Sequence, residues 1–152
     1  MEISGSATGT ERKNAMNINP KWGAWATPPK PFAKEDFAET YQTEVLVIGA
    51  GMTGMAAAMK LDEAGYDYVV IEKNSDVGGT WYENRYPGVG VDTPSHFYSF
   101  SWEVPTHWQH YHPQGADMQR YMLDVADKYD IRRNIRFNHK VERLEYDAAT
   151  GT

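Results

Sequence analysis

Three glycines at fixed spacing constrain the fold of this chain more than any other feature. Gly49, Gly51 and Gly54 form a G-x-G-x-x-G pattern directly after the apolar residues 45–48. That apolar run is rich in β-branched residues and does not alternate with polar ones, which is typical of a strand buried on both faces. Residues 55–61 are strong helix formers. The sequence therefore predicts a strand, a tight glycine turn and a helix in direct succession.

The following residues complete a βαβ unit. Gly65 stands where that helix would end, a place that often requires a residue with positive φ. Residues 68–71 predict a second buried strand, which closes at Glu72. Strand, turn, helix and strand within about 30 residues imply two parallel strands joined by a right-handed crossover. The predicted fold class is therefore α/β, a Rossmann-like unit with a parallel sheet.

This arrangement suits a dinucleotide. Gly49 permits the tight turn, Gly51 lets the backbone approach a pyrophosphate, and Gly54 lets the helix pack close to the strand. Free N–H groups and the positive dipole end at the helix start attract phosphate. Glu72 follows Gly54 by 18 residues, where a carboxylate accepts hydrogen bonds from a ribose. Since an acid there disfavours a 2′-phosphate, we expect FAD or NAD rather than NADP. The alternative is a tight turn that binds nothing.

The second half of the chain predicts one more helix and two more strands. Apolar residues on one face predict a helix over 116–129. Residues 134–137 and 140–146 predict strands, the latter because it alternates cleanly. Residues 147–152 have turn composition, and no strand returns after them. We therefore expect an incomplete sheet, truncated in a β-hairpin.

Composition and charge exclude several classes of function. Residues 1–41 contain prolines that cannot continue a helix or a central strand, and they predict an N-terminal extension before a domain over 42–152. The formal net charge of −6 disfavours nucleic-acid binding, and the absence of cysteine excludes disulfides and thiolate catalysis. No apolar run reaches the ~18 residues of a membrane helix. We expect a soluble, cytoplasmic protein with no nucleic-acid or membrane partner.

A longer motif after the second strand carries a specific resemblance. Residues 78–92 read GGTWYENRYPGVGVD. This motif resembles the second flavin-contacting segment of class B flavoprotein monooxygenases, and most closely that of the Baeyer–Villiger monooxygenases of the 4-hydroxyacetophenone monooxygenase branch. The resemblance covers about residues 42–147. It implies that residues 42–152 are the N-terminal part of an FAD-binding domain, with the remainder of the enzyme missing.

The family's activity and the residues that serve it follow from the same resemblance. It implies an NADPH- and O2-dependent monooxygenase that oxidises ketones or aldehydes to esters or acids, with NADPH bound mainly by the missing part. Trp81 would wall the flavin, Val141 would meet the adenine through its backbone, and Asp92 beside the flavin ring is the candidate catalytic residue. The implied cofactor-binding residues are Gly49, Gly51, Met52, Thr53, Gly54, Glu72, Lys73, Gly79, Thr80, Trp81, Tyr82, Asp92, Tyr98 and Val141.

Two further expectations come from the residues themselves. Asp92 lies on an apolar, glycine-rich segment where an unpaired carboxylate would be costly, so we expect it to be functional or hydrogen-bonded. His107, His110 and His112 match no known closed metal site and have no nearby carboxylate to complete one, so we expect no metal.

Two other functions stay open. One is an N- or S-oxygenating flavin monooxygenase on the same scaffold, and the other is a flavin- or nucleotide-binding module without catalysis. Because the parts for flavin reduction and carbonyl activation are expected outside the chain, we expect it to show little or no turnover alone.

Overall fold

The computed structural model describes residues 42–106 and 108–151. The extension predicted over residues 1–41 lies outside the described residues. The elements follow in the order β1 (Val45–Ile48), α1 (Met52–Ala64), β2 (Tyr68–Ile71), α2 (Thr80–Glu83), α3 (Gly115–Lys128), the 3-10 helix η2 (Ile131–Asn134) and β3 (Ile135–Arg136). No described helix has both the length and the apolar character needed to cross a membrane.

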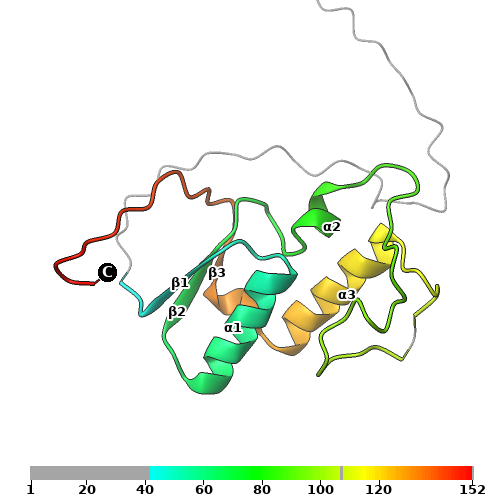
Figure 1. Ribbon diagram of the computed structural model, residues 1–152, viewed down its shortest axis with the longest axis horizontal. Coiled ribbons are helices and arrows are strands. Elements are labelled where there is room, and N and C mark those ends of the chain that lie inside the picture. Colours follow the sequence, from blue (N-terminus) through cyan, green and yellow to red (C-terminus); the bar gives the residue numbers. More distant parts are fainter. Residues whose placement is uncertain (1–41, 107, 152) are drawn as a thin grey trace, which may run out of the picture.

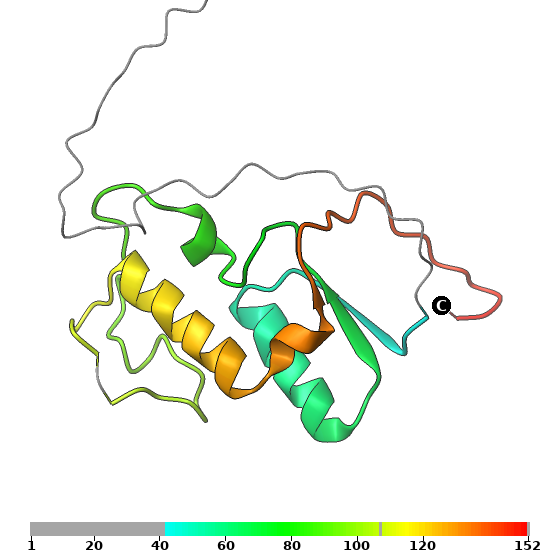
Figure 2. The same ribbon diagram turned by 180° about the vertical axis from the view of Figure 1, so that it is seen from behind.

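The three strands form a parallel sheet with β2 in the middle. Strand β1 pairs with β2 in the register Val45 to Tyr68, and β2 pairs with β3 in the register Val70 to Ile135. Helices α1 and α3 both lie on one side of this sheet (Figure 1), and Figure 2 shows the same arrangement from behind. The predicted α/β class and its parallel βαβ unit are confirmed.

The core lies where α1, α3 and the sheet meet. Met55 of α1, Met118 and Met122 of α3, and Ile131 of η2 are all essentially inaccessible to solvent. Flexible methionine side chains fill the irregular space between two helices and a short sheet well. This core fixes α3 against the βαβ unit, although the long stretch of chain between them contains, in its described part, only the short helix α2.

The helix ends agree with their sequence signals. Helix α1 ends at Gly65, whose φ of 76° allows its N–H to bond to carbonyls of the last turn. Helix α3 begins with a capping box, in which the side chains of Gln114 and Asp117 each bond to the other residue's backbone. The helix predicted over 116–129 is confirmed.

Two predictions about strands are wrong. Leu46 and Ile48 of β1 are 46% and 52% exposed, because among the described residues only one face of β1 is covered by a helix. Residues 140–146 form no strand, and Leu144 and Tyr146 are exposed. A strand needs a pairing strand as well as alternation, and no strand within residues 42–106 and 108–151 pairs with this segment. The strand predicted over 134–137 shortens to β3, and the expected closing hairpin does not form there.

Candidate functional site

The turn between β1 and α1 has the geometry that its glycines predict. Gly49 has a φ of 92°, which residues with side chains rarely adopt. A Cβ on Gly54 would overlap the carbonyl oxygen of Gly49, so only glycine lets α1 pack this close to the turn. A Cβ on Gly51, by contrast, would meet nothing closer than Gly79 Cα at 3.7 Å. Gly51 therefore leaves open space that the fold itself does not need.

The first turn of α1 is available to an anion. The first hydrogen bond of the helix runs from Met55 N to Gly51 O, so the N–H groups of Met52, Thr53 and Gly54 precede the intrahelical ladder. No side chain caps this end, and the first turn holds no acidic residue. Backbone donors and the helix dipole therefore attract negative charge to this end.

Two cavities adjoin over the glycine turn. The first, the turn cavity, has a volume of about 380 Å³ and is lined by Ile48, Gly49, Gly51, Met52, Thr53, Gly54, Gly78, Gly79, Thr80, Trp81 and Tyr98. The second, the Glu72 cavity, has about 360 Å³ and is lined by Ile48, Gly49, Gly51, Ile71, Glu72, Lys73, Gly79, Glu83, His139, Lys140 and Val141. Because the two share Ile48, Gly49, Gly51 and Gly79, one elongated ligand can occupy both and cross the turn between them.

Glu72 joins the end of β2 to the glycine turn. Its side chain is buried, and its Oε2 accepts a hydrogen bond from Ala50 N at 2.6 Å while its Oε1 accepts one from Asn74 N at 2.7 Å. Each carboxylate oxygen has a second lone pair, so both can still accept a hydroxyl hydrogen. The structure thus adds a role in shaping the turn to the ribose-binding role predicted for this residue, which stays a prediction.

An ion pair borders the Glu72 cavity. Lys73 Nζ lies 2.8 Å from Glu83 Oε1, which also accepts a hydrogen bond from Asn74 Nδ2 at 2.8 Å. The hydrogen bond to Glu83 raises the pKa of Lys73 above its usual value, and the hydrogen bond from Lys73 lowers the pKa of Glu83. Helix α2 therefore holds a charged ammonium group at the edge of this cavity.

An aromatic pair borders the turn cavity at its other end. Trp81 of α2 is buried, and its ring meets that of Tyr98 edge to face, with centroids 5.7 Å apart. Gly78 N donates a hydrogen bond to Ala50 O at 3.0 Å, which ties the start of α2 to the glycine turn. The site is thus polar at its Glu72 end and aromatic at its Trp81 end.

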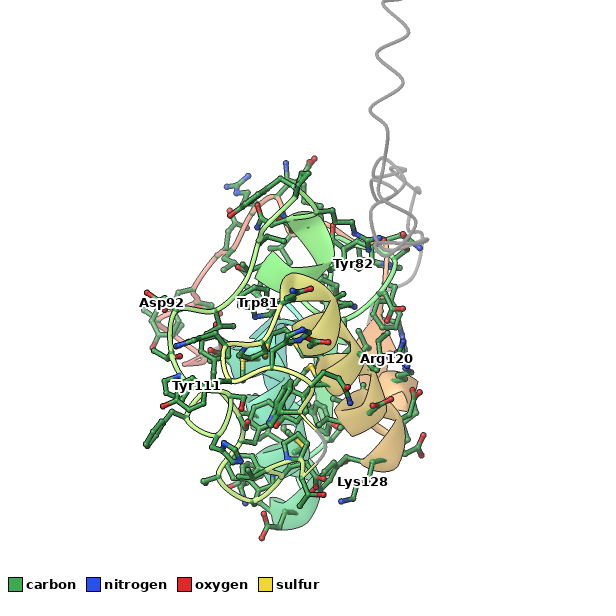
Figure 3. All side chains as sticks on the ribbon, turned by 90° about the vertical axis from the view of Figure 1, so that its right-hand side faces the viewer. Trp81, Tyr82, Asp92, Tyr111, Arg120 and Lys128 are labelled. Carbon is green, nitrogen blue, oxygen red and sulfur yellow. The ribbon has the colours of Figure 1, made fainter. Side chains whose placement is uncertain are left out.

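Tyr82 and Asp92 are the two predicted site residues that line neither cavity. The Tyr82 hydroxyl lies 2.6 Å from Ser75 Oγ, and its ring faces the Arg85 guanidinium at 5.0 Å. Asp92 is exposed to solvent, and Figure 3 shows it at the edge of the molecule, beyond Trp81. Because Asp92 is exposed, its carboxylate does not carry the cost of burial, and its functional role stays a prediction.

Several lining residues were not predicted from the sequence, namely Ile48, Ile71, Gly78, Glu83, His139 and Lys140. Glu83 lies within the motif of residues 78–92, so its spacing from Lys73 could have drawn attention to it. His139 and Lys140 directly precede Val141; Lys140 falls in the strand predicted over 140–146, and His139 lies between the two predicted strands.

A histidine near α3 has a carboxylate partner after all. His110 Nδ1 lies 2.9 Å from Asp117 Oδ2, which also accepts a hydrogen bond from Gln114 N. A carboxylate therefore does lie beside one of the histidines, where it also caps the start of α3. Among residues 42–106 and 108–151 no three groups of metal-ligand type gather in one place; His107 lies outside them.

A larger hollow of about 740 Å³ lies between α3 and the loop that carries Glu103 and Trp108. Its lining includes Arg120 and Lys128, which Figure 3 shows at the edge opposite Asp92. The hollow contains none of the predicted site residues, so it is separate from the glycine turn.

Comparison with known proteins identifies relatives of one kind. Residues 47–114 match the family model of the NAD(P)-binding Rossmann-like domain. A Baeyer-Villiger monooxygenase of Streptomyces coelicolor is 40% identical over 104 residues, which is 68% of this chain and 20% of that protein. Cyclohexanone 1,2-monooxygenase of Acinetobacter sp is 37% identical over 111 residues, 70% of this chain and 20% of that protein.

Solved structures agree with these relatives. The FAD-bound crystal structure of OTEMO superposes with a TM-score of 0.68 at 36% identity, over 73% of this chain and 22% of that chain. An oxidised steroid monooxygenase bound to NADP gives a TM-score of 0.61 at 37% identity, over 63% of this chain and 19% of that chain. The chain thus spans about a fifth of the length of the curated relatives that it matches.

Proposed function

We propose, from the premise that this chain is a relative of the flavoprotein monooxygenases of Baeyer–Villiger type, that its described residues bind FAD across the glycine turn. The observation that carries the proposal is the pair of adjoining cavities, one ending at Glu72 and the other at Trp81 and Tyr98. FAD has the matching order, with an adenosine, a charged pyrophosphate and a flat ring system. NAD, which the acid at Glu72 also allows, has a smaller second ring and fits the aromatic end less well.

The chain's own residues fit FAD part by part. The N–H groups of Met52, Thr53 and Gly54 bind the pyrophosphate, which Gly51 admits to the backbone. Glu72 accepts hydrogen bonds from the ribose, with Lys73 beside it and the Val141 backbone near the adenine. Gly79, Thr80, Trp81 and Tyr98 hold the flavin end and keep water from it.

When bound, FAD would supply the redox chemistry of the reaction. The whole reaction that we propose is the NADPH- and O2-dependent oxidation of a small ketone or aldehyde to an ester or acid, as in cyclohexanone 1,2-monooxygenase. Because the chain spans about a fifth of its relatives, we assign NADPH and carbonyl binding mainly to residues outside it. Tyr82 and Asp92 stay within the proposed flavin segment. Asp92, exposed at the end of that segment, is the candidate catalytic residue and would meet the nicotinamide side. A cytoplasmic location is part of the proposal and suits a chain without cysteine.

The test is to add the cofactor in parts. In the 15N-labelled chain, ADP should shift the amide signals of residues 49–54, Lys73 and Val141 and leave the Trp81 indole signal in place. FAD should shift the same signals and the Trp81 indole in addition. If the folded chain binds no FAD, or if FAD shifts signals only at the hollow beside α3, the proposal is wrong.

A further inference from the structure

The loop of residues 75–79 sets the shape of the turn cavity. Gly78 has a φ of 132° and Gly79 a φ of 52°, and such conformations persist only where their surroundings hold them. Gly79 also lies against the glycine turn, since a Cβ on it would be 3.0 Å from Gly51 Cα. A small movement of this loop would therefore move α2 and Trp81 relative to the helix start.

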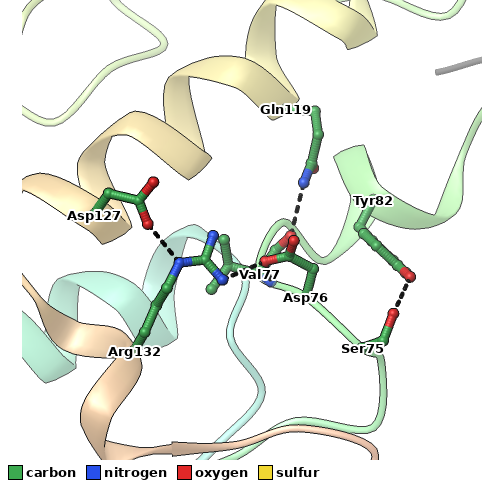
Figure 4. A network of polar contacts seen from close by, with 7 residues as sticks. All are labelled: Ser75, Asp76, Val77, Tyr82, Gln119, Asp127 and Arg132. Carbon is green, nitrogen blue, oxygen red and sulfur yellow. Dashed lines mark hydrogen bonds and ion pairs between the residues drawn. The ribbon is translucent and has the colours of Figure 1, made fainter. Parts of the chain in front are cut away.

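Three side-chain contacts hold this loop from outside (Figure 4). Ser75 Oγ bonds to the Tyr82 hydroxyl, and Asp76 Oδ1 pairs with the Arg132 guanidinium at 2.7 Å; both contacts are half-exposed. The third contact is buried: Gln119 Nε2 of α3 donates a hydrogen bond to the Val77 carbonyl oxygen at 2.9 Å. Water competes least with the buried contact, which is therefore the firmest of the three.

The other end of the Gln119 amide meets the same loop. Its side chain is 6% exposed, and its Oε1 has no hydrogen-bond partner among the described residues. A Cβ on Gly78 would overlap this oxygen, so an α-hydrogen of Gly78 points at it, as in a weak C–H···O contact. The Gln119 amide thus contacts the loop twice, through a hydrogen bond to the Val77 carbonyl and a C–H···O contact with Gly78.

Burying the Gln119 amide at this position lowers the stability of the fold. Its neighbours on the buried face of α3, Met118 and Met122, are apolar and fully buried, and an apolar residue at 119 would avoid burying a half-satisfied amide. Packing alone does not require an amide at this position, because an apolar side chain could fill the same space. The contacts that the Gln119 side chain makes are with residues 77 and 78, in the loop that borders the glycine turn.

We propose that Gln119 is a positioning residue for FAD, which fixes residues 75–79 from α3 so that the glycine turn and Trp81 keep the spacing that the cofactor needs. Gln119 lines neither cavity and acts through Val77 and Gly78. The inference rests on the proposed function.

The test compares Gln119→Met with Val125→Ala in the 152-residue chain. Methionine keeps the length and helix propensity of glutamine but removes the donor and the acceptor. It should weaken FAD binding about five- to tenfold, the value of one hydrogen bond, and speed hydrogen exchange at the amides of Gly78 and Gly79 without ligand. It should also change the fluorescence of the bound flavin. Val125, buried on α3 and absent from both cavities, is the control: its truncation should lower the melting temperature but leave loop exchange and FAD affinity unchanged.

The outcomes separate the two claims. If the wild-type chain binds no FAD, the proposed function falls and the inference falls with it. If the wild type binds FAD and Gln119→Met binds it equally well with unchanged loop exchange, only the inference falls. The same holds if Gln119→Met behaves like the control. Gln119→Leu, which also removes both the donor and the acceptor, should repeat the loss.

Discussion

Replacing Gly51 with alanine separates cofactor binding from folding. Gly51 has a φ of −76° and a ψ of −176°, which alanine adopts without strain. The added Cβ would meet only Gly79 Cα, at an ordinary 3.7 Å. Alanine is a poorer residue than glycine at the start of a helix, but it also lowers the entropy of the unfolded chain, and both effects are below about 1 kcal/mol. We therefore expect the free energy of unfolding to change by less than about 0.5 kcal/mol.

The same methyl group would stand where the pyrophosphate approaches the backbone. If it displaces the phosphates enough to break one charge-assisted hydrogen bond to Met52, Thr53 or Gly54, about 1.5–3 kcal/mol of binding free energy is lost. That is a roughly 10- to 150-fold increase in the Kd for FAD. ADP should weaken by a similar factor, because it carries the same pyrophosphate.

The assay is a calorimetric titration of FAD and ADP into both chains, with thermal unfolding of each without ligand. Gly54→Ala is the matched contrast: its Cβ would overlap Gly49 O, so it should lower the melting temperature before binding is considered. A Gly51→Ala chain that melts like the wild type and binds FAD within threefold of it would refute the placement of the phosphates.

Three further predictions follow from other parts of the site and core. Trp81→Leu should weaken FAD about tenfold, the value of an aromatic contact, while ADP titrations stay unchanged; an equal loss for ADP would contradict the two-ended site. Glu83→Gln should return the pKa of Lys73 toward its ordinary value. Because the pair is largely exposed, the variant should lose only about 0.2–1 kcal/mol of stability. The raised pKa of Lys73 stabilises below about pH 10.4 and the lowered pKa of Glu83 above about pH 4.3, so the loss should appear in unfolding curves at pH 7 and vanish well below pH 4. Met55→Ala should cost about 2–5 kcal/mol and Leu46→Ala less than about 1 kcal/mol, measured by urea unfolding; similar costs would mean that the exposed face of β1 is covered in solution.

The parts of the fold that could be predicted are those with local signals. The glycine spacing, the apolar run before it and Gly65 predict the βαβ unit, because each of these acts within its own turn or strand. The spacing of apolar residues along 116–129 likewise predicts the helix α3. In each case the conformation depends on neighbours within a few residues.

The parts that could not be predicted depend on distant partners. Residues 140–146 alternate like a strand, but none of the described strands pairs with them. Leu46 and Ile48 look buried by composition, but burial requires a second layer over their face. The hydrogen bond from Gln119 to Val77 joins residues 42 positions apart, and no periodicity in the sequence indicates such a contact.

The hydrogen bonds of Glu72 affect how a ligand would bind beside it. Ala50 N and Asn74 N hold both of its oxygens in one orientation before any sugar arrives. The Glu72 carboxylate is therefore already ordered in the folded chain, so binding a ligand costs no further side-chain entropy at this residue. A preorganised carboxylate of this kind should therefore strengthen the binding of a ribose beside it.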